Sequence, residues 1–189
     1  MTTITIERRD YNALRACAAV NEVRYYLNGI YLDCPNQMLV ATNGHHMLTV
    51  PMANVFPTDA PPCIVAIPKM AKLPKKIDHV RLNVATRTME TIDKGGAIFF
   101  TQPIELIDAK YAEWQYVVRK VPSWHADATE TRVASVPFNP IYLAAVTSAL
   151  EVDIVDMRPG PSRGDVIVAR FTRDDTVLDA RYYLMPMRL

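Results

Sequence analysis

The stretch RYYLNGIYLDCPNQMLVATNGHH, residues 24–46, is the part of the chain that best indicates its fold. It contains two runs that are rich in aromatic and β-branched residues, together with an Asn-Gly turn signal. Runs of this kind favour strands, and Asn-Gly pairs favour the tight turns that join antiparallel strands. The stretch contains no catalytic triad and no cage of metal ligands. It therefore predicts a surface built from paired strands.

The pattern to which this stretch belongs, a strand, a helix and three further strands, occurs three times along the chain. Short strand-like runs at residues 3–6, 63–67 and 132–137 each come directly before a helical segment. The helical segments are ERRDYNALRACAAV (7–20), PKMAKLPKK (68–76) and FNPIYLAAVTSALE (138–151). The strand-like runs that follow them are residues 23–33, 37–42 and 46–52, then 79–85, 87–93 and 96–102, and finally 152–157, 165–171 and 180–187.

Three β-α-β-β-β units predict an α+β fold. We expect one complete two-unit domain at residues 1–107, an irregular connector at 108–131 and a C-terminal half-domain at 132–189. In the third helix, Asn139 is a suitable cap and Pro140 a suitable first residue. A single unit exposes one helix and one face of its sheet, so the third unit should need a partner to complete a core.

Two long sequence matches and the C-terminal tail resemble one known family, the bacterial replicative sliding clamp, which is the beta subunit of DNA polymerase III. The stretch VRYYLNGIYLD…LVATNGHHML is similar to the second domain of that clamp. The segment FNPIYLAAVTSAL and the final residues YYLMPMRL resemble the helix and tail of its last half-domain. Family chains carry six units, whereas this chain carries three. The resemblance implies a shortened, non-enzymatic clamp that binds duplex DNA independently of sequence, and the short form indicates a phage, plasmid or other mobile element.

In this family, a hydrophobic groove between the second and third domains binds short peptides carried by polymerases, the clamp loader and repair factors. The resemblance implies that the groove in this chain consists of Arg24, Leu27, Thr42, Gly44, His45, His46, Met47, Tyr116, Val117, Asn139, Tyr142, Leu184, Met185, Pro186, Met187 and Arg188. Flexible methionine side chains suit a surface that accepts several related peptides. Without the resemblance, the Met-Pro-Met tail would be interpreted as an ordinary final strand with core methionines.

Position 46 differs from the family pattern, because His46 stands where the family commonly has arginine. This difference weakens one charged contact of the groove. The pair His45-His46 also raises the question of a metal site. Adjacent residues on a strand point to opposite faces, so we expect that the two rings cannot chelate one ion together.

The inner surface of the family's ring is lined by the unit helices and faces duplex DNA. The candidate DNA-binding residues in this chain are Arg8, Arg9, Arg15, Tyr25, Tyr26, Lys69, Lys72, Lys75 and Lys76. Lysine and arginine give a sequence-independent, salt-sensitive attraction to phosphates, which suits a protein that slides. The alternative is that the lysine cluster is a solvated outer face. The third helix carries no basic residue, so we expect a lining that is positive only in patches.

The number of units predicts the assembly. Family rings contain 12 units, so four chains of three units each would close one ring. The lone third unit would expose Tyr142, Leu143, Val146 and Leu150, and we expect it to pair with the third unit of another chain about a two-fold axis.

Two other functions compete with the clamp. The first is a clamp-like decoy that forms no ring and sequesters clamp-binding proteins, as a dimer or as a monomer whose third unit folds back onto the first two. The second is an enzyme, but no Ser/His/Asp arrangement, P-loop or glycine-rich phosphate cradle occurs in the sequence.

Composition limits the remaining possibilities. The formal net charge of +1 excludes a protein that wraps nucleic acid by bulk charge, but not a locally positive surface. No apolar run is long enough to span a bilayer, and the N-terminal residues lack the apolar region of a signal peptide. Cys17, Cys34 and Cys63 form no C-x-x-C pair, which favours buried free thiols in a reducing compartment. We expect a cytoplasmic protein without a cofactor, metal or membrane partner.

Overall fold

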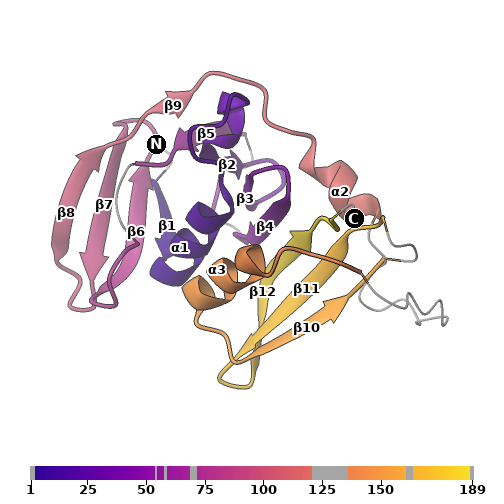
Figure 1. The fold of residues 1–189 in the computed structure, drawn as a ribbon. Coiled ribbons are helices and arrows are strands. Elements are labelled where there is room, and N and C mark those ends of the chain that lie inside the picture. Colours follow the sequence, from indigo (N-terminus) through magenta and orange to yellow (C-terminus); the bar gives the residue numbers. More distant parts are fainter. Residues whose placement is uncertain are drawn as a thin grey trace.

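The computed structural model describes residues 3–53, 55–57, 59–68, 72–120, 136–160 and 164–187. The strands are β1 (Thr3–Glu7), β2 (Gly29–Asp33), β3 (Met38–Thr42), β4 (His46–Pro51), β5 (Cys63–Ala66), β6 (Ile77–Asn83), β7 (Thr88–Asp93), β8 (Ile98–Pro103), β9 (Leu106–Ile107), β10 (Ile154–Arg158), β11 (Ile167–Arg173) and β12 (Thr176–Leu184). The helices are α1 (Arg8–Cys17), α2 (Trp114–Lys120), α3 (Pro140–Leu150) and the 3-10 helix η1 (Tyr25–Leu27). Figure 1 shows α1 and α3 next to each other, with strands around them, so the predicted α+β architecture is confirmed.

The strands form two antiparallel sheets, in which the first and second units exchange one strand each. The four-stranded sheet has the order β1-β6-β7-β8, and the eight-stranded sheet has the order β10-β11-β12-β4-β3-β2-β5-β9. The strand that begins the first unit therefore pairs with β6 of the second unit, and β5, which begins the second unit, pairs with β2 of the first. This exchange interlocks the two units, because removing either one would break the sheet of the other.

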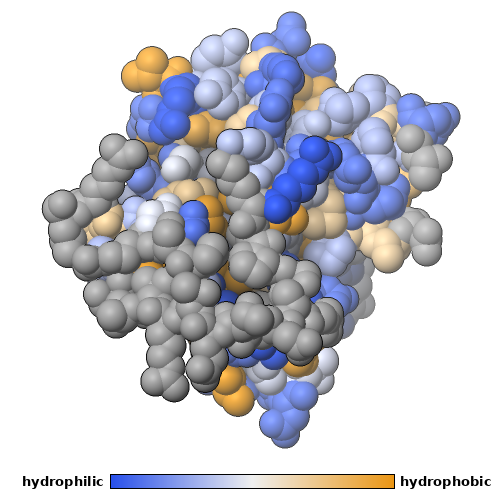
Figure 2. Space-filling model, turned by 90° about the vertical axis from the view of Figure 1, so that its right-hand side faces the viewer, coloured by the Kyte–Doolittle hydropathy of each residue, from blue (hydrophilic) through white to orange (hydrophobic). Residues whose placement is uncertain are grey.

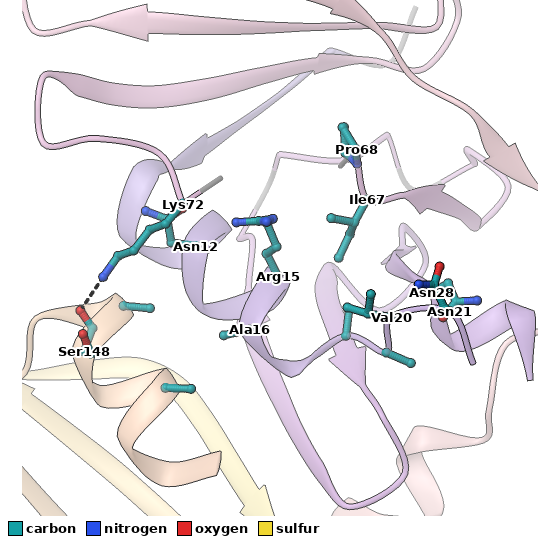
Figure 3. A pocket seen from close by; sticks show the side chains of 14 residues that line it. Asn12, Arg15, Ala16, Val20, Asn21, Asn28, Ile67, Pro68, Lys72 and Ser148 are labelled. Atoms are coloured by element: carbon teal, nitrogen blue, oxygen red, sulfur yellow. Dashed lines mark hydrogen bonds between the residues drawn. The ribbon is translucent and has the colours of Figure 1, made fainter. Parts of the chain in front are cut away.

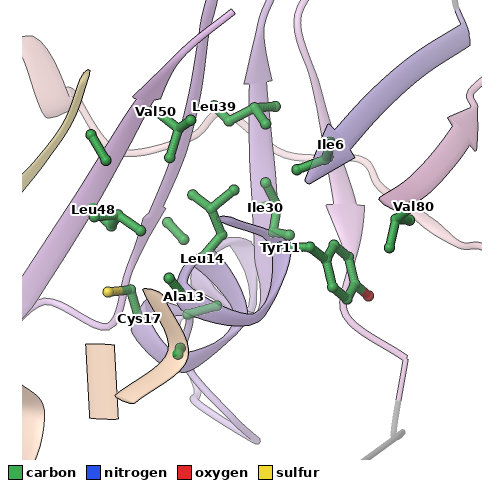
Figure 4. Packing of buried hydrophobic residues seen from close by; sticks show 14 of the residues in the cluster. Ile6, Tyr11, Ala13, Leu14, Cys17, Ile30, Leu39, Leu48, Val50 and Val80 are labelled. Atoms are coloured by element: carbon green, nitrogen blue, oxygen red, sulfur yellow. The ribbon is translucent and has the colours of Figure 1, made fainter. Parts of the chain in front are cut away.

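Helix α1 packs against both sheets because its apolar residues recur at helical spacing. Tyr11, Leu14 and Cys17 are buried in the main core cluster. Figure 4 shows α1 beside side chains from both sheets: Ile6, Ile30, Leu39, Leu48, Val50 and Val80. Burial of one such side chain contributes about 1.5–3 kcal/mol to folding. The helix ends at Cys17, so Val20, the last residue of the predicted helical segment, lies beyond the helix and is exposed.

The third unit docks on the first unit of the same chain. Strand β12 pairs antiparallel with β4, with Leu184 opposite His46 and Tyr183 opposite Met47. Helix α3 packs beside α1 over the same sheet. The third unit thereby extends the first unit's sheet and shares its core.

This docking corrects the expectation of a third unit that exposes its apolar helix face. Val146 and Leu150 of α3 are buried in the main core cluster, and Tyr142 and Leu143 are partly buried against it. The first unit of the same chain covers the face for which we expected a second chain. The predicted start of α3 is confirmed, since Asn139 Oδ1 accepts the N–H of Ile141 at 3.0 Å and Pro140 is the first helical residue.

Two arginines of α1 bind Glu151 at the C-terminal end of α3 and stabilise the docking of the third unit. Arg8 Nη2 donates to Glu151 Oε1 at 2.9 Å, and Arg9 Nε donates to Glu151 Oε2 at 2.9 Å. Burial of Glu151 opposes ionisation, but the hydrogen bonds and charges of the two arginines outweigh it and lower the pKa of this carboxyl. The carboxylate therefore stays ionised and joins the two helices.

Three local predictions differ from the structure. Residues 25–27 form η1 and not the beginning of a strand, because the side chain of Asn28 bonds to the backbone of Glu22 in both directions and holds this segment curled. Residues 72–76 form no helix, in keeping with Pro74, which cannot donate a helical hydrogen bond. The connector, expected to be irregular, contains α2. Residues 69–71 of the second predicted helix and 132–135 of the third predicted strand lie outside the described residues.

Helix α2 is anchored on the face of the eight-stranded sheet that is opposite to α1. The indole N–H of Trp114 donates to Asp33 Oδ2 at 2.9 Å, and Tyr111 stacks on Tyr31 with ring centroids 4.6 Å apart. Trp114 and Tyr111 belong to a second core cluster, separate from the one around α1. The eight-stranded sheet is therefore covered on both faces near β4.

Candidate peptide-binding surface

The predicted groove residues from the first and third units meet where β4 pairs with β12. The N–H of Met185 donates to the carbonyl oxygen of His45 at 2.9 Å, and the N–H of Met187 donates to that of Pro137 at 2.8 Å. These bonds join the turn before β4, the segment before α3 and the segment after β12. We call the exposed and half-buried residues gathered there the junction surface: Gly44, His45, Asn139, Tyr142, Met185, Pro186 and Met187.

The junction surface is largely apolar. The ring of Tyr142 lies nearly parallel to the ring of His45, with centroids 6.0 Å apart. Met185 and Pro186 are half-buried, and Met187 is 50% exposed. Aromatic and methionine side chains that are only partly covered can receive apolar anchors of a bound chain. This arrangement suits an extended peptide with large apolar side chains.

His46 lies beneath the junction surface and is 1% exposed. Its ring stacks on Tyr142 at 4.4 Å, and its Nδ1 lies 3.0 Å from the hydroxyl of Tyr182 and 3.6 Å from Cys17 Sγ. Burial lowers the pKa of His46 to about 4, and the neighbouring His45 acts in the same direction. The neutral ring links β4 with α1, α3 and β12, and it offers no charge to a peptide.

The turn between β3 and β4 is held by its own side chains. The hydroxyl of Thr42 donates to the carbonyl oxygen of His46 at 2.7 Å and accepts the N–H of Gly44 at 3.0 Å. Gly44 has a φ of +88°, and a Cβ at this position would come within 2.9 Å of the guanidinium of Arg24. Arg24 itself lies over the turn and donates to the carbonyl oxygen of Asn43 at 3.4 Å. Arg24 also pairs with Glu22 at 3.4 Å, so a guanidinium partly balanced by a carboxylate forms this margin of the junction surface.

The remaining groove candidates lie below the surface or apart from it. Leu27 and Met47 are buried in the second core cluster, and Val117 of α2 packs against that cluster. Leu184 is buried in the main core, whereas Tyr116 is 60% exposed on α2. The buried members support the sheet and present no side chain to a peptide on the exterior. Arg188 lies outside the described residues.

The basic residues proposed to face DNA fall into separate groups. Arg8 is 7% exposed and, like Arg9, is engaged by Glu151. We therefore leave Arg8 out of any DNA-facing surface, because its guanidinium is buried against a carboxylate. The sequence contains no local signal for this pairing, since Arg8 and Glu151 are 143 residues apart.

Arg15 and Lys72 lie together at a hollow of about 510 Å³ beside α1. Figure 3 shows the hollow between α1, the segment after β5 and α3, with Lys72 Nζ donating to the carbonyl oxygen of Ser148 at 3.1 Å. Arg8 and Arg9 line another concavity, but there they are engaged by Glu151, whereas Arg15 and Lys72 lie beside largely apolar residues. Alanine side chains and Val20 form much of the remaining lining.

The other DNA candidates lie elsewhere. Lys75 and Lys76 are exposed at the start of β6, and Lys76 Nζ lies 3.6 Å from the ring centroid of Phe99. Tyr25 is exposed and Tyr26 half-buried in η1, with their rings edge to face at 6.3 Å. Lys69 lies outside the described residues.

Other features of the surface are less specific. On the side shown in Figure 2, hydrophilic and hydrophobic residues alternate in small patches over the coloured area. In the part of the chain that the structure describes, no group of three or more His, Cys, Asp or Glu side chains is placed to hold a metal ion. Within the same residues, every helix is too short or too polar to cross a membrane.

Comparison with known proteins identifies the fold. The sequence matches no protein-family model and no curated protein. The structure is similar to the DNA polymerase sliding clamp of Pseudomonas aeruginosa, with a TM-score of 0.63 and 20% identity over 100% of this chain and 67% of that one. The Caulobacter crescentus beta sliding clamp gives a TM-score of 0.63 with 18% identity, and the DNA polymerase III beta subunit of Thermotoga maritima gives 0.60 with 11%. Each is covered over 66% of its length by the whole of this chain. The chain therefore has the sliding-clamp fold, as the resemblance predicted, and it covers about two thirds of each of these clamps.

Proposed function

We propose that this chain is a compact DNA sliding clamp, which encircles duplex DNA and tethers a polymerase and other clamp-binding proteins through their peptide segments. The observation that supports this most is the pairing of β4 with β12. That pairing joins the β3–β4 turn, the start of α3 and the segment after β12, which are the three segments that carry the resemblance to sliding clamps. The proposed activity is binding without catalysis, in the cytoplasm.

The proposed peptide lies on the junction surface. Its large apolar side chains contact Tyr142, Met185 and Pro186, which are half-buried. Arg24 provides a positive charge at the margin and contacts polar groups of the peptide. His46 stiffens this surface from below and leaves recognition to its neighbours, because its ring is buried and neutral.

The proposed ring contains four chains, since 12 units divided by three units per chain is four. The docking of the third unit changes how such a ring would close. Strands β4 and β12 pair within the chain, so the outer strands that remain for contacts between chains are β1, β8, β9 and β10. Arg15, Lys72 and Lys75 are the described cations that we place toward DNA, and they give salt-sensitive attraction without sequence preference.

The decoy remains the second candidate, and two observations favour it. The third unit folds back onto the first unit of its own chain, which is the arrangement that a monomeric decoy requires. In addition, Arg8 and Arg9 are engaged by Glu151, which leaves fewer cations for phosphates. Both functions use the junction surface, so they differ only in DNA binding and assembly.

Peptide binding is tested by titrating a fluorescently labelled polymerase tail peptide into the wild-type protein and the double variant Met185→Ala, Met187→Ala. Truncating two apolar contacts costs about 1–3 kcal/mol, so we expect affinity to fall by about 5- to 150-fold. Val177→Ala is the matched control, because Val177 is exposed at the opposite end of β12. An unchanged affinity of the double variant would contradict the assignment of the junction surface.

Assembly and DNA binding separate the clamp from the decoy. Native mass spectrometry of a ring should give four times 21.3 kDa. Duplex DNA affinity of the clamp should be weak and fall steeply with salt, and Lys72→Glu, Lys75→Glu should reduce it further. A stable monomer with no salt-dependent DNA binding, but with intact peptide binding, favours the decoy.

A further inference from the structure

Strand β8 forms an outer edge of the four-stranded sheet and is unusually apolar for such a position. Three consecutive large side chains are open to solvent, with Ile98 55%, Phe99 53% and Phe100 43% exposed. Strand β7 pairs with one side of β8, and in the part of the chain that the structure describes no strand pairs with the other. Exposed apolar edges of this kind offer unpaired backbone groups to another strand.

The other sheet edges in the described part of the chain are protected. Strand β10 carries Asp156 and Arg158, and β1 ends at Glu7. Strand β9 has only two residues. Charges and short lengths are the devices by which proteins prevent edge pairing. By contrast, residues 95–102 contain no charged residue.

Strand β8 contains a bulge, which adds one aromatic residue to the edge. Thr91 lies opposite Phe100 and Ile92 lies opposite Ile98, so Phe99 has no residue opposite it on β7. Bulges can blunt an edge, but this one adds an exposed ring and no charge.

An apolar hollow of about 230 Å³ lies beside this edge. Its lining residues are Leu73, Pro74, Ile77, Thr91, Phe99 and Phe100. Lys76 lies over the ring of Phe99 and places a cation at the same site. The hollow has room to receive apolar side chains from a strand that pairs with β8.

We propose that β8 pairs antiparallel with β8 of a second copy of this chain about a two-fold axis. An antiparallel pair places the beginning of each strand beside the end of the other. The exposed Lys94, just before β8, would then lie near the exposed Glu105, just after β8 of the second copy. The two-fold axis generates this pair of opposite charges twice, while the paired strands themselves bring no like charges together.

A second copy accounts for these features better than an unrelated strand does. The uncharged centre and the oppositely charged ends of this segment are complementary to the same segment in reverse direction. Two copies of Ile98, Phe99 and Phe100 would cover one another, which removes exposed apolar surface from both chains. The proposal does not depend on the proposed function, because it is argued from the exposure, register and charges of β8 alone.

The first test is the mass of the protein at micromolar concentration by light scattering. We expect at least twice 21.3 kDa for the wild type, and half the wild-type mass for Ile98→Lys, Phe100→Lys. Val177→Lys, which adds a lysine at an exposed position of β12, should keep the wild-type mass. A monomeric wild type would overturn the proposal, and so would an edge variant that keeps the wild-type mass.

The second test identifies the contact between copies by exchanging two exposed charges, Lys94 and Glu105. Lys94→Glu and Glu105→Lys should each lower the dimer affinity, and the double exchange should restore it. Lys94 lies in the turn before β8 and Glu105 follows β8, and the six residues of β8 span about 20 Å between them. Restoration therefore requires contact between two copies. Single variants with wild-type affinity, or a double variant without restoration, would overturn the antiparallel pairing.

Discussion

Apolar residues are buried at the junction between the first and third units, but they are exposed at the β8 edge of the second unit. At the junction, Val146 and Leu150 of α3 are buried against the first unit. At the edge, Ile98 and Phe99 are more than half exposed. Both regions are the outer parts of a unit that needs a partner. The chain therefore buries the apolar face of its third unit, whereas β8 of its second unit remains an exposed edge of the sheet.

The largest expected difference between the two regions is in stability. Leu150→Ala removes a fully buried side chain at the junction and should lower the free energy of unfolding by about 2–5 kcal/mol. Ile98→Ala at the edge should change it by about 0.5 kcal/mol or less, because an exposed side chain loses little burial in the single chain. Urea unfolding at a concentration below that of self-association measures both values. Equal losses would show that the edge is covered in the folded monomer.

The pH dependence of stability should also come from the junction. The pKa of His46 is about 4 in the folded protein and about 6.5 when unfolded, so the unfolded chain binds the proton first as pH falls. Stability is therefore full above pH 6.5 and is lost toward pH 4, by roughly 3 kcal/mol.

The substitution His46→Gln should flatten this pH dependence, whereas His45→Gln, at the exposed neighbouring position, should keep most of it because burial is the larger cause of the lowered pKa. Thermal or urea unfolding between pH 4 and pH 8 checks the result. A wild-type slope in the His46 variant would assign the pH dependence to other groups.

The ion pairs of Glu151 should have an intermediate effect. Glu151→Gln leaves Arg8 buried without its carboxylate and should cost about 1–3 kcal/mol at neutral pH. The lowered pKa of Glu151 means that this contribution is present above pH 4.5 and is lost as pH falls further. Chemical unfolding of the variant at pH 7 and pH 3 measures it. Asp156→Asn, which breaks the more exposed pair with Arg170, is the control and should cost much less.

The smallest expected effect is at the β8 edge. Lys76→Gln removes the cation above Phe99 and should change the free energy of unfolding by about 0.5–1 kcal/mol. Lys75→Gln, at the exposed neighbouring position, should change it less. A loss of 2 kcal/mol or more in the Lys76 variant would mean that Phe99 and its cation are part of a core.

Most strands could be predicted from the sequence because their alternation and turn residues are local. Strand β3, for example, occupies most of the run at residues 37–42, and the cap of α3 at Asn139 follows from Asn-Pro at the helix start. The helix expected at residues 68–76 is missing from 72–76, where Pro74 interrupts it. Helix α2 was not predicted, because its anchor is the bond between Trp114 and Asp33, which are 81 residues apart.

The candidate site was predictable in its segments but not in the roles of its residues. Tyr142 and Met185 are partly exposed at the junction surface, whereas His46 is buried beneath it and Leu27 and Met47 are buried in the second core cluster. The residue types do not distinguish these cases. A histidine or methionine is compatible with an exposed or a buried position, and the sheet that covers it comes from another part of the chain.

The sequence by itself determined most strands, the cap of α3 and the likeness to the sliding clamp, because propensity, periodicity and motif are properties of neighbouring residues. Only the tertiary structure decided that β12 pairs with β4, that Glu151 engages Arg8 and that β8 is an open edge. Each of these depends on which distant segments come into contact. Such contacts form only when the intervening chain closes a loop, at a cost in conformational entropy, and neighbouring residues do not specify which loop closes.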